Sequence, residues 1–146
     1  MYSDHEISSM QKLAQTLPLK YPAGFINAAP DALRSILNGY GPDYWPEDLR
    51  KIVNWIFRHY PTAAAIHDWR YEFSDGRESA RVAADAEFAA NLILLWQNRY
   101  GWTRYFLPMA WFDYCKLRTA AILVRRFGCR AWQNSYRQKK FSGGAA

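Results

Sequence analysis

The longest regular pattern of apolar residues runs from about Ser79 to Asn98. Several of its apolar positions, such as Phe88, Leu92 and Leu95, are three or four residues apart, the spacing that places side chains on one face of an α-helix. The apolar residues of the pattern are Val82, Ala83, Ala86, Phe88, Leu92, Leu95 and Trp96. Gly101 follows closely, and a glycine just past an apolar run commonly ends a helix. The pattern therefore predicts a helix over about 79–98.

Two shorter helices are predicted before it. Glu47 opens an apolar pattern of helical spacing that continues to Phe57. Pro61 interrupts this pattern, and a proline is well suited to the first turn of the helix that follows. That second helix is expected from Thr62 to about Phe73.

Weaker patterns occupy the two ends of the chain. The last helix is expected from about Pro108 to Phe127, with Gly128 as the residue that ends it. Proline and glycine residues punctuate the first third of the chain. The elements expected there are short helices at about 9–17 and 31–37 and loops at 21–30 and 39–46.

These patterns favour a mainly α fold, because strand signals are weak throughout the chain. A length of 146 residues suits one domain. We expect a single domain of four to five helices, residues 1–136, built around an antiparallel helix pair and with its core at about 31–132. Residues 137–146 are rich in basic residues and are expected to form a flexible tail.

Composition adds two observations. Seven Trp, ten Tyr and eight Phe make aromatic residues 17% of the chain. Large rings help a small domain to build a core, and Trp and Tyr also suit a surface that is half wet and half apolar. We assign most of these rings to the core, and an interfacial role stays open.

The net charge of +6 is unevenly distributed. Residues 1–96 carry nine Lys or Arg against twelve Asp or Glu, whereas residues 97–146 carry ten against a single acid, Asp113. A basic half attracts phosphate, whether on nucleic acid or on an anionic lipid surface. A solvated helix face would have the same composition, so charge alone does not identify the partner.

Several classes of protein are excluded. No apolar run reaches the roughly 18 residues of a membrane-spanning helix, and the first ten residues lack the basic and apolar regions of a signal peptide. We therefore expect no transmembrane segment and synthesis in the cytoplasm. Cys115 and Cys129 are too few for a disulfide framework or a metal cluster.

His67 is the histidine whose neighbours suggest chemistry. In its predicted helix it shares a face with Tyr71, whereas Asp68 points about 100° away. Asp85 lies among apolar positions of the following helix, where a carboxylate needs a polar partner. That partner is expected to be His67, unless Asp85 pairs with Arg81 four residues before it. A carboxylate bound to one ring nitrogen leaves the other free as a general base.

The pattern His67-Asp68-x-x-Tyr71, followed by an aspartate in the next helix, resembles the calcium-dependent phospholipase A2 superfamily. The upstream segment 38–42, NGYGP, is similar to the glycine-rich calcium loop of that family. The order of these elements resembles the disulfide-free bacterial and viral members, and the resemblance covers about residues 38–88.

The resemblance implies a role for each matching residue. His67 would deprotonate the water that attacks a phospholipid ester, Asp85 would hold the imidazole in the productive tautomer, and Tyr71 would hydrogen-bond Asp85. Asp68 would bind Ca²⁺, an ion that takes oxygen ligands, together with backbone carbonyls. The carbonyls implied are those of Tyr40, Gly41 and Pro42.

A second resemblance concerns residues 81–88, RVAADAEF, and 124–132, VRRFGCRAW. Together they resemble a small family of uncharacterised phage and prophage proteins, over about residues 63–132. This resemblance implies a phage or host protein as a partner and a place in the virion as one expected location.

Three functions follow as hypotheses. The leading one is a phage- or prophage-type, phospholipase A2-like hydrolase that uses Ca²⁺ at a phospholipid surface. The second is a non-catalytic phage accessory or structural protein that keeps the helix pair as a scaffold. The third is a basic nucleic-acid-binding module that uses the C-terminal third, where Arg125, Arg126 and Arg130 alternate with aromatic rings.

Overall fold

The computed structural model of the chain describes residues 2–37 and 47–142, and every regular element within those ranges is a helix. The chain is a single, mainly α domain, as the sequence predicts. In chain order the elements are α1 (Asp4–Thr16), α2 (Ala23–Asn27), α3 (Pro30–Ile36), α4 (Glu47–His59), α5 (Pro61–Glu72), α6 (Glu78–Tyr100), the 3₁₀-helix η1 (Gly101–Tyr105) and α7 (Pro108–Ser142).

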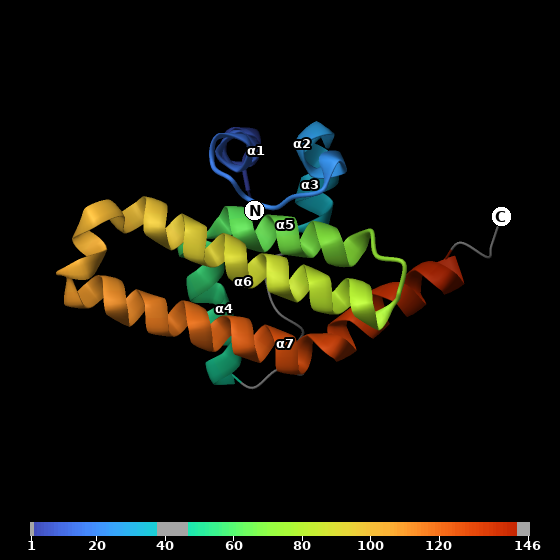
Figure 1. Cartoon of the computed structure of the whole chain (residues 1–146). Coiled ribbons are helices and arrows are strands. Elements are labelled where there is room, and N and C mark those ends of the chain that lie inside the picture. Colours follow the sequence, from blue (N-terminus) through green and yellow to red (C-terminus); the bar gives the residue numbers. More distant parts are fainter. Residues whose placement is uncertain (1, 38–46, 143–146) are drawn as a thin grey trace.

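The two longest helices, α6 and α7, form an antiparallel hairpin that is closed at one end by η1 (Figure 1). Helix α5 lies along α6 and runs in the opposite direction, which makes α5 and α6 the antiparallel pair expected from the sequence. Helices α1 and α3 pack on another side of α5, and α4 packs on both α5 and α7.

Helix α5 is central because most of its side chains are buried, including all six at 62–67. Pro61 occupies its first turn, and the three alanines 63–65 let neighbouring helices approach closely. Its buried residues include Ile66, Trp69 and Tyr71. A helix that buries all of its faces must have neighbours on every side, and α5 contacts α1, α3, α4, α6 and α7.

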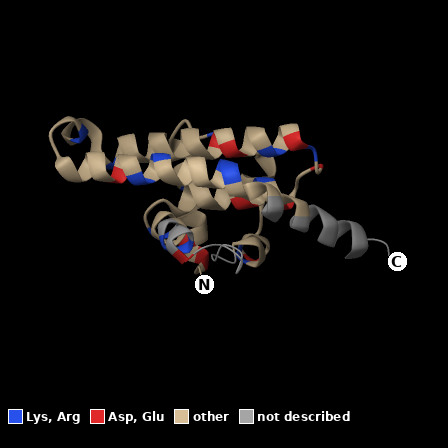
Figure 2. Cartoon of the chain, turned by 90° about the horizontal axis from the view of Figure 1, so that it is seen from below, with Lys and Arg blue, Asp and Glu red and all other residues tan. Residues whose placement is uncertain are grey.

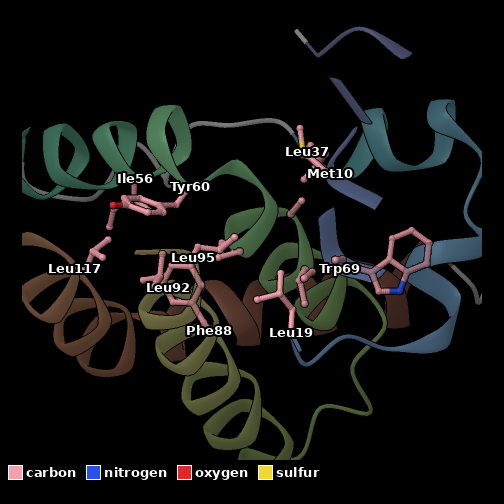
Figure 3. Close-up of a cluster of buried hydrophobic side chains, with 14 of the residues drawn as sticks. Met10, Leu19, Leu37, Ile56, Tyr60, Trp69, Phe88, Leu92, Leu95 and Leu117 are labelled. Carbon is pink, nitrogen blue, oxygen red and sulfur yellow. The ribbon is translucent and has the colours of Figure 1, made fainter. Parts of the chain in front are cut away.

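The main core fills the space between these helices, and Figure 3 shows Met10, Ile56, Phe88 and Leu117 among its members. Met10 belongs to the apolar face of α1, which also buries Ile7 and Ala14. The core therefore begins well before residue 31, the limit expected from the sequence.

Two side-chain amides, one buried and one half-buried, attach irregular segments to the helices. Asn91, fully buried on α6, accepts a hydrogen bond from the Lys20 backbone N and donates to the Lys20 carbonyl, both at 2.8 Å. Gln11 Nε2 on α1 lies 3.0–3.1 Å from the carbonyl oxygens of Phe25, Ile26 and Ala28, where α2 ends. Both amides satisfy backbone groups that would otherwise lack a partner.

The structure corrects two expectations about elements. The predicted loop 21–30 contains the short helix α2, and α7 does not stop at Gly128 but continues to Ser142. Residues 137–142 of the expected tail are thus the end of α7, while residues 143–146 and the predicted loop 39–46 lie outside the described residues. None of the described helices is long and apolar enough to cross a membrane.

Candidate functional site

The candidate site lies where α5 and α6 run side by side. His67 on α5 faces Asp85 on α6, and the His67 Nε2 atom lies 3.1 Å from Asp85 Oδ1. The contact between these two side chains that the sequence predicts is therefore present. The side chain of Asp85 is 1% exposed and that of His67 is 10% exposed, so water competes little for this hydrogen bond.

Tyr71, one turn after His67 on α5, binds the same carboxylate oxygen. Its hydroxyl donates to Asp85 Oδ1 at 2.6 Å, and its ring packs on the imidazole with centroids 4.1 Å apart. Burial, reinforced by the charge of Asp85, raises the pKa of the Tyr71 hydroxyl far above its ordinary value. Tyr71 therefore stays protonated and remains a hydrogen-bond donor over the usual pH range.

Helix α7 holds Tyr71 from the other side. The Trp132 ring meets the Tyr71 ring edge to face, with centroids 4.8 Å apart. A Cβ atom built on Gly128 would lie only 2.6 Å from the Tyr71 hydroxyl oxygen. Gly128 is therefore needed inside α7 because the two helices approach so closely there, and it does not mark the end of α7.

Arg81 occupies the second oxygen of Asp85. Its Nη1 atom lies 2.5 Å from Asp85 Oδ2 and 3.2 Å from the carbonyl oxygen of Arg125 on α7. The hydrogen bond with Glu78, followed by the charges of Asp85 and Glu78, raises the pKa of the Arg81 guanidinium despite its burial. Both pairings that the sequence left open for Asp85 therefore exist together, one on each oxygen.

The remaining ring nitrogen of His67 is the one able to take up a proton. The carboxylate of Asp85 is an acceptor, so the Nε2 proton lies on His67 in this hydrogen bond and Nδ1 of the neutral ring keeps its lone pair. Burial alone would lower the pKa of the imidazole, but the carboxylates of Asp68 and Asp85 outweigh it and raise the pKa above its ordinary value. Phe88 packs on the ring, with centroids 4.7 Å apart.

Asp68 lies beside this free nitrogen. Its Oδ1 atom is 3.7 Å from His67 Nδ1, beyond hydrogen-bond distance, and its side chain is 28% exposed. Burial raises the pKa of the Asp68 carboxyl, and the imidazole opposes that rise. The structure thus places a partly exposed carboxylate next to the nitrogen that could activate a water.

The implied calcium site is described only in part. Asp68 supplies a hard oxygen of the kind Ca²⁺ takes, whereas Tyr40, Gly41 and Pro42 lie outside the described residues. Residues 2–37 and 47–142 contain no group of three His, Cys, Asp or Glu side chains able to hold a metal. Among them, Asp68 fits the role of a single ligand beside His67.

Two grooves border the hydrogen-bond network formed by Asp85 with His67, Tyr71 and Arg81. One, of about 280 Å³, lies between α6 and α7, and Asp85, Arg118 and Arg125 are among the residues that line it. The other, of about 340 Å³, is lined by Arg70, Trp132 and residues of the turn after α5. Neither of these grooves is lined by His67, so both lie beside the His67–Asp85 contact and not over it.

The supporting roles of Gly128, Trp132 and Glu78 were not apparent from the sequence. Gly128 has the usual signature of a helix stop, because glycine commonly has that meaning next to an apolar run. The ion pair of Glu78 with Arg81 has a recognisable signal, since opposite charges three residues apart on a helix are neighbours. Trp132 offered no signal beyond its aromatic side chain.

Comparisons with known proteins identify no relative of this chain. No protein-family model, no curated protein and no solved structure matches it.

Proposed function

We propose that this protein is a hydrolase that cleaves a phospholipid ester, with His67 as the general base. The observation that supports this proposal is the chain of contacts from Tyr71 through Asp85 to His67 Nε2. It holds the imidazole in one tautomer and leaves Nδ1 beside a partly exposed carboxylate, Asp68. This is the arrangement that a water-activating histidine requires.

In this mechanism each residue has a separate task. His67 Nδ1 takes a proton from water while that water attacks the ester carbonyl, and the imidazolium later returns the proton to the leaving alcohol. Asp85 stabilises the imidazolium through Nε2, and Tyr71 keeps Asp85 oriented by its 2.6 Å hydrogen bond. A positioned base of this kind contributes about 10²–10⁴-fold to the rate.

A calcium ion fits this proposal as the group that polarises the ester carbonyl and neutralises the developing oxyanion. Asp68 would hold it, with the backbone carbonyls of Tyr40, Gly41 and Pro42 as the further ligands that the resemblance implies.

The test measures fatty-acid release from phosphatidylglycerol vesicles in the presence of millimolar CaCl₂. We expect the wild-type protein to release fatty acid, and His67→Gln to lower the rate by about 10²–10⁴-fold, as expected for loss of a general base. Asp68→Asn should abolish both activity and calorimetric Ca²⁺ binding while the far-ultraviolet circular dichroism stays unchanged.

His59→Gln is the matched control. The His59 ring stacks on Trp55 and hydrogen-bonds the Trp55 backbone carbonyl, and it takes no part in the contact between His67 and Asp85. The variant should retain the full rate. A wild-type protein that neither cleaves lipid nor binds calcium would refute the proposed hydrolase.

The second candidate is a non-catalytic phage accessory or structural protein, in which the same residues only connect helices. The second oxygen of Asp85 favours it, because Arg81 links that oxygen to the backbone of Arg125 and so joins α6 to α7. In such a protein, substitutions that break the hydrogen-bond network around Asp85 would lower stability, and there would be no lipid cleavage to lose.

A further inference from the structure

The end of the α6–α7 hairpin exposes an unusual number of large apolar side chains. Trp102 is 81% and Phe106 77% exposed, and their apolar neighbours are also largely exposed. We call this set the aromatic tip. It comprises Trp102, Tyr105, Phe106, Leu107, Met109, Trp111 and Phe112.

The packing of the hairpin does not account for this exposure. At the start of α7, Ala110 and Asp113 are the buried positions, whereas Trp111 and Phe112 between them point outward. Polar residues are expected on the outer face of such a helix. Exposed apolar residues gathered in one place usually mark an interaction surface.

The form of the tip indicates which partner covers it. It is the projecting end of a helical hairpin and carries exposed side chains from η1, from the connection at 106–107 and from α7 (Figure 1). A groove on a protein would cover one side of such an end, whereas a lipid layer would surround it. Trp and Tyr are the residues enriched at membrane–water interfaces.

The charges at the tip are complementary to an anionic surface. Arg104 lies over the Tyr105 ring at 4.6 Å, and Lys116 lies over both the Phe112 ring at 4.3 Å and the Trp55 ring of α4 at 4.5 Å. Each cation therefore borders an exposed ring of the tip. Asp113, the acid nearest in the chain, is buried and accepts a hydrogen bond from Tyr100. Figure 2 shows acidic as well as basic residues along the long helices, whereas Arg104 and Lys116 are the charged side chains beside the exposed rings.

We propose that the aromatic tip inserts into the interfacial layer of an anionic phospholipid bilayer and anchors the protein there. The tip lies in the interface without crossing the bilayer, since no described helix is long and apolar enough to cross it. Trp102 and Phe106 supply the apolar contact, and Arg104 and Lys116 meet the lipid phosphates. This inference does not depend on the proposed hydrolysis, because residue 101 is 16 helical positions, about 24 Å, beyond Asp85 along α6.

The experiment measures binding to vesicles of phosphatidylcholine containing phosphatidylglycerol, by co-sedimentation and by quenching of tryptophan emission with brominated acyl chains. The double variant Trp102→Ser, Phe106→Ser should bind about 100-fold more weakly, because two large apolar side chains no longer leave water. The control Phe73→Ser removes an exposed ring at the opposite end of α6 and should bind like the wild type.

A second pair of variants tests the charges. Arg104→Gln and Lys116→Gln should each weaken binding to anionic vesicles about fivefold, the contribution expected of one basic residue near such a surface. The double control Lys12→Gln, Lys20→Gln removes exposed cations that lie outside the aromatic tip and should not change binding.

His67→Gln should still bind vesicles, which keeps this test separate from that of hydrolysis. Wild-type protein that stays in solution with anionic vesicles would overturn the inference. It would also be overturned if sedimentation equilibrium showed that the tip variants dissociate a dimer while vesicle binding is unchanged, because the tip would then join two copies of the chain.

Discussion

At the residue scale, Asp85 is the group on which the site depends, because its two oxygens serve different partners. Oδ1 accepts from His67 and Tyr71, whereas Oδ2 pairs with Arg81. The first set of contacts orients the proposed base, and the second joins neighbouring helices. Substitutions can therefore separate a chemical role from a structural one.

Asp85→Asn should destabilise the fold by roughly 3 kcal/mol, because it leaves the buried guanidinium of Arg81 without one of its two anionic partners. His67→Gln should cost less, since the amide can still donate to Asp85. Urea denaturation followed by circular dichroism measures both free energies of unfolding. Equal stability of Asp85→Asn and the wild type would contradict a stabilising role of the buried ion pair.

A second residue-scale prediction concerns pH. Burial raises the pKa of Tyr60 to about 12, whereas in the unfolded chain a tyrosine ionises near pH 10. Between about pH 10 and 12 the unfolded chain alone therefore loses this proton, and the contribution of Tyr60 to stability falls as the pH rises through that window.

Tyr60→Phe should remove this part of the alkaline loss of stability. The measurement is the melting temperature at several pH values between about 9 and 12. Tyr105→Phe, at an exposed tyrosine of the aromatic tip, is the control and should follow the wild-type curve. A Tyr60→Phe curve as steep as that of the wild type would assign the alkaline transition to other groups.

At the element scale, Gly128 sets how closely α7 approaches α5. In an ordinary helix interior, Gly→Ala stabilises by up to about 1 kcal/mol. Here the new methyl group would lie 2.6 Å from the Tyr71 hydroxyl oxygen. Gly128→Ala should therefore destabilise by roughly 1–3 kcal/mol, as overpacking commonly does, in a chemical denaturation experiment.

The double variant Gly128→Ala, Tyr71→Phe provides the control for this prediction. Removing the hydroxyl also removes the close contact, so the alanine should cost less in that background, and the two substitutions should not be additive. If Gly128→Ala changed the free energy of unfolding equally with and without the hydroxyl, the proposed contact would be contradicted.

A second element-scale prediction concerns the segment that joins α1 to α2. Asn91 holds it by two hydrogen bonds to the backbone of Lys20. Asn91→Leu would leave both backbone groups unpaired, at a cost of roughly 2–4 kcal/mol at about 1–2 kcal/mol per group. Amide hydrogen exchange should then speed up at Lys20. Unchanged protection of that amide would contradict the proposed role of Asn91 in holding this segment.

At the scale of the whole molecule, the sequence predicts the helices that have regular apolar spacing. The helices expected at 79–98 and 62–73 lie within about two residues of α6 and α5. The pairing of His67 with Asp85 was expected because short loops place successive helices antiparallel, and a buried carboxylate needs a partner. The spacing of apolar residues is sufficient to predict these two helices. The need of a buried carboxylate for a polar partner is sufficient to predict the pairing.

What the sequence did not predict depends on contacts between distant segments. Gly128 resembles a helix stop, and only the approach of Tyr71 from α5 explains why it continues the helix. The tip contains the same aromatic residue types as the core, so residue type alone does not predict that the rings of the tip are exposed. Their exposure follows from the turn at η1, which carries them beyond the helices that could have covered them.

The distribution of charge over the whole chain leads to a last prediction, which separates a lipid surface from nucleic acid as the partner. Ten of the nineteen basic residues lie in 97–146, where Asp113 is the one acid. Charge alone would attract either partner. Binding to nucleic acid by charge should weaken with salt, with a slope of nearly one unit of log K per phosphate contact, and should vanish near 1 M NaCl, where the screening length is about 3 Å.

Insertion of the aromatic tip adds an apolar contribution that salt does not screen. Binding to anionic vesicles should therefore weaken between low salt and 1 M NaCl but level off at a measurable affinity, and quenching by brominated acyl chains should persist there. The Trp102→Ser, Phe106→Ser variant should lose this residual binding, because it lacks the apolar contact. It retains every charge of the wild type, so the loss could not be attributed to charge. Binding of the wild type to duplex DNA with a steep salt slope, and to no vesicle at any salt concentration, would instead identify a nucleic-acid-binding module.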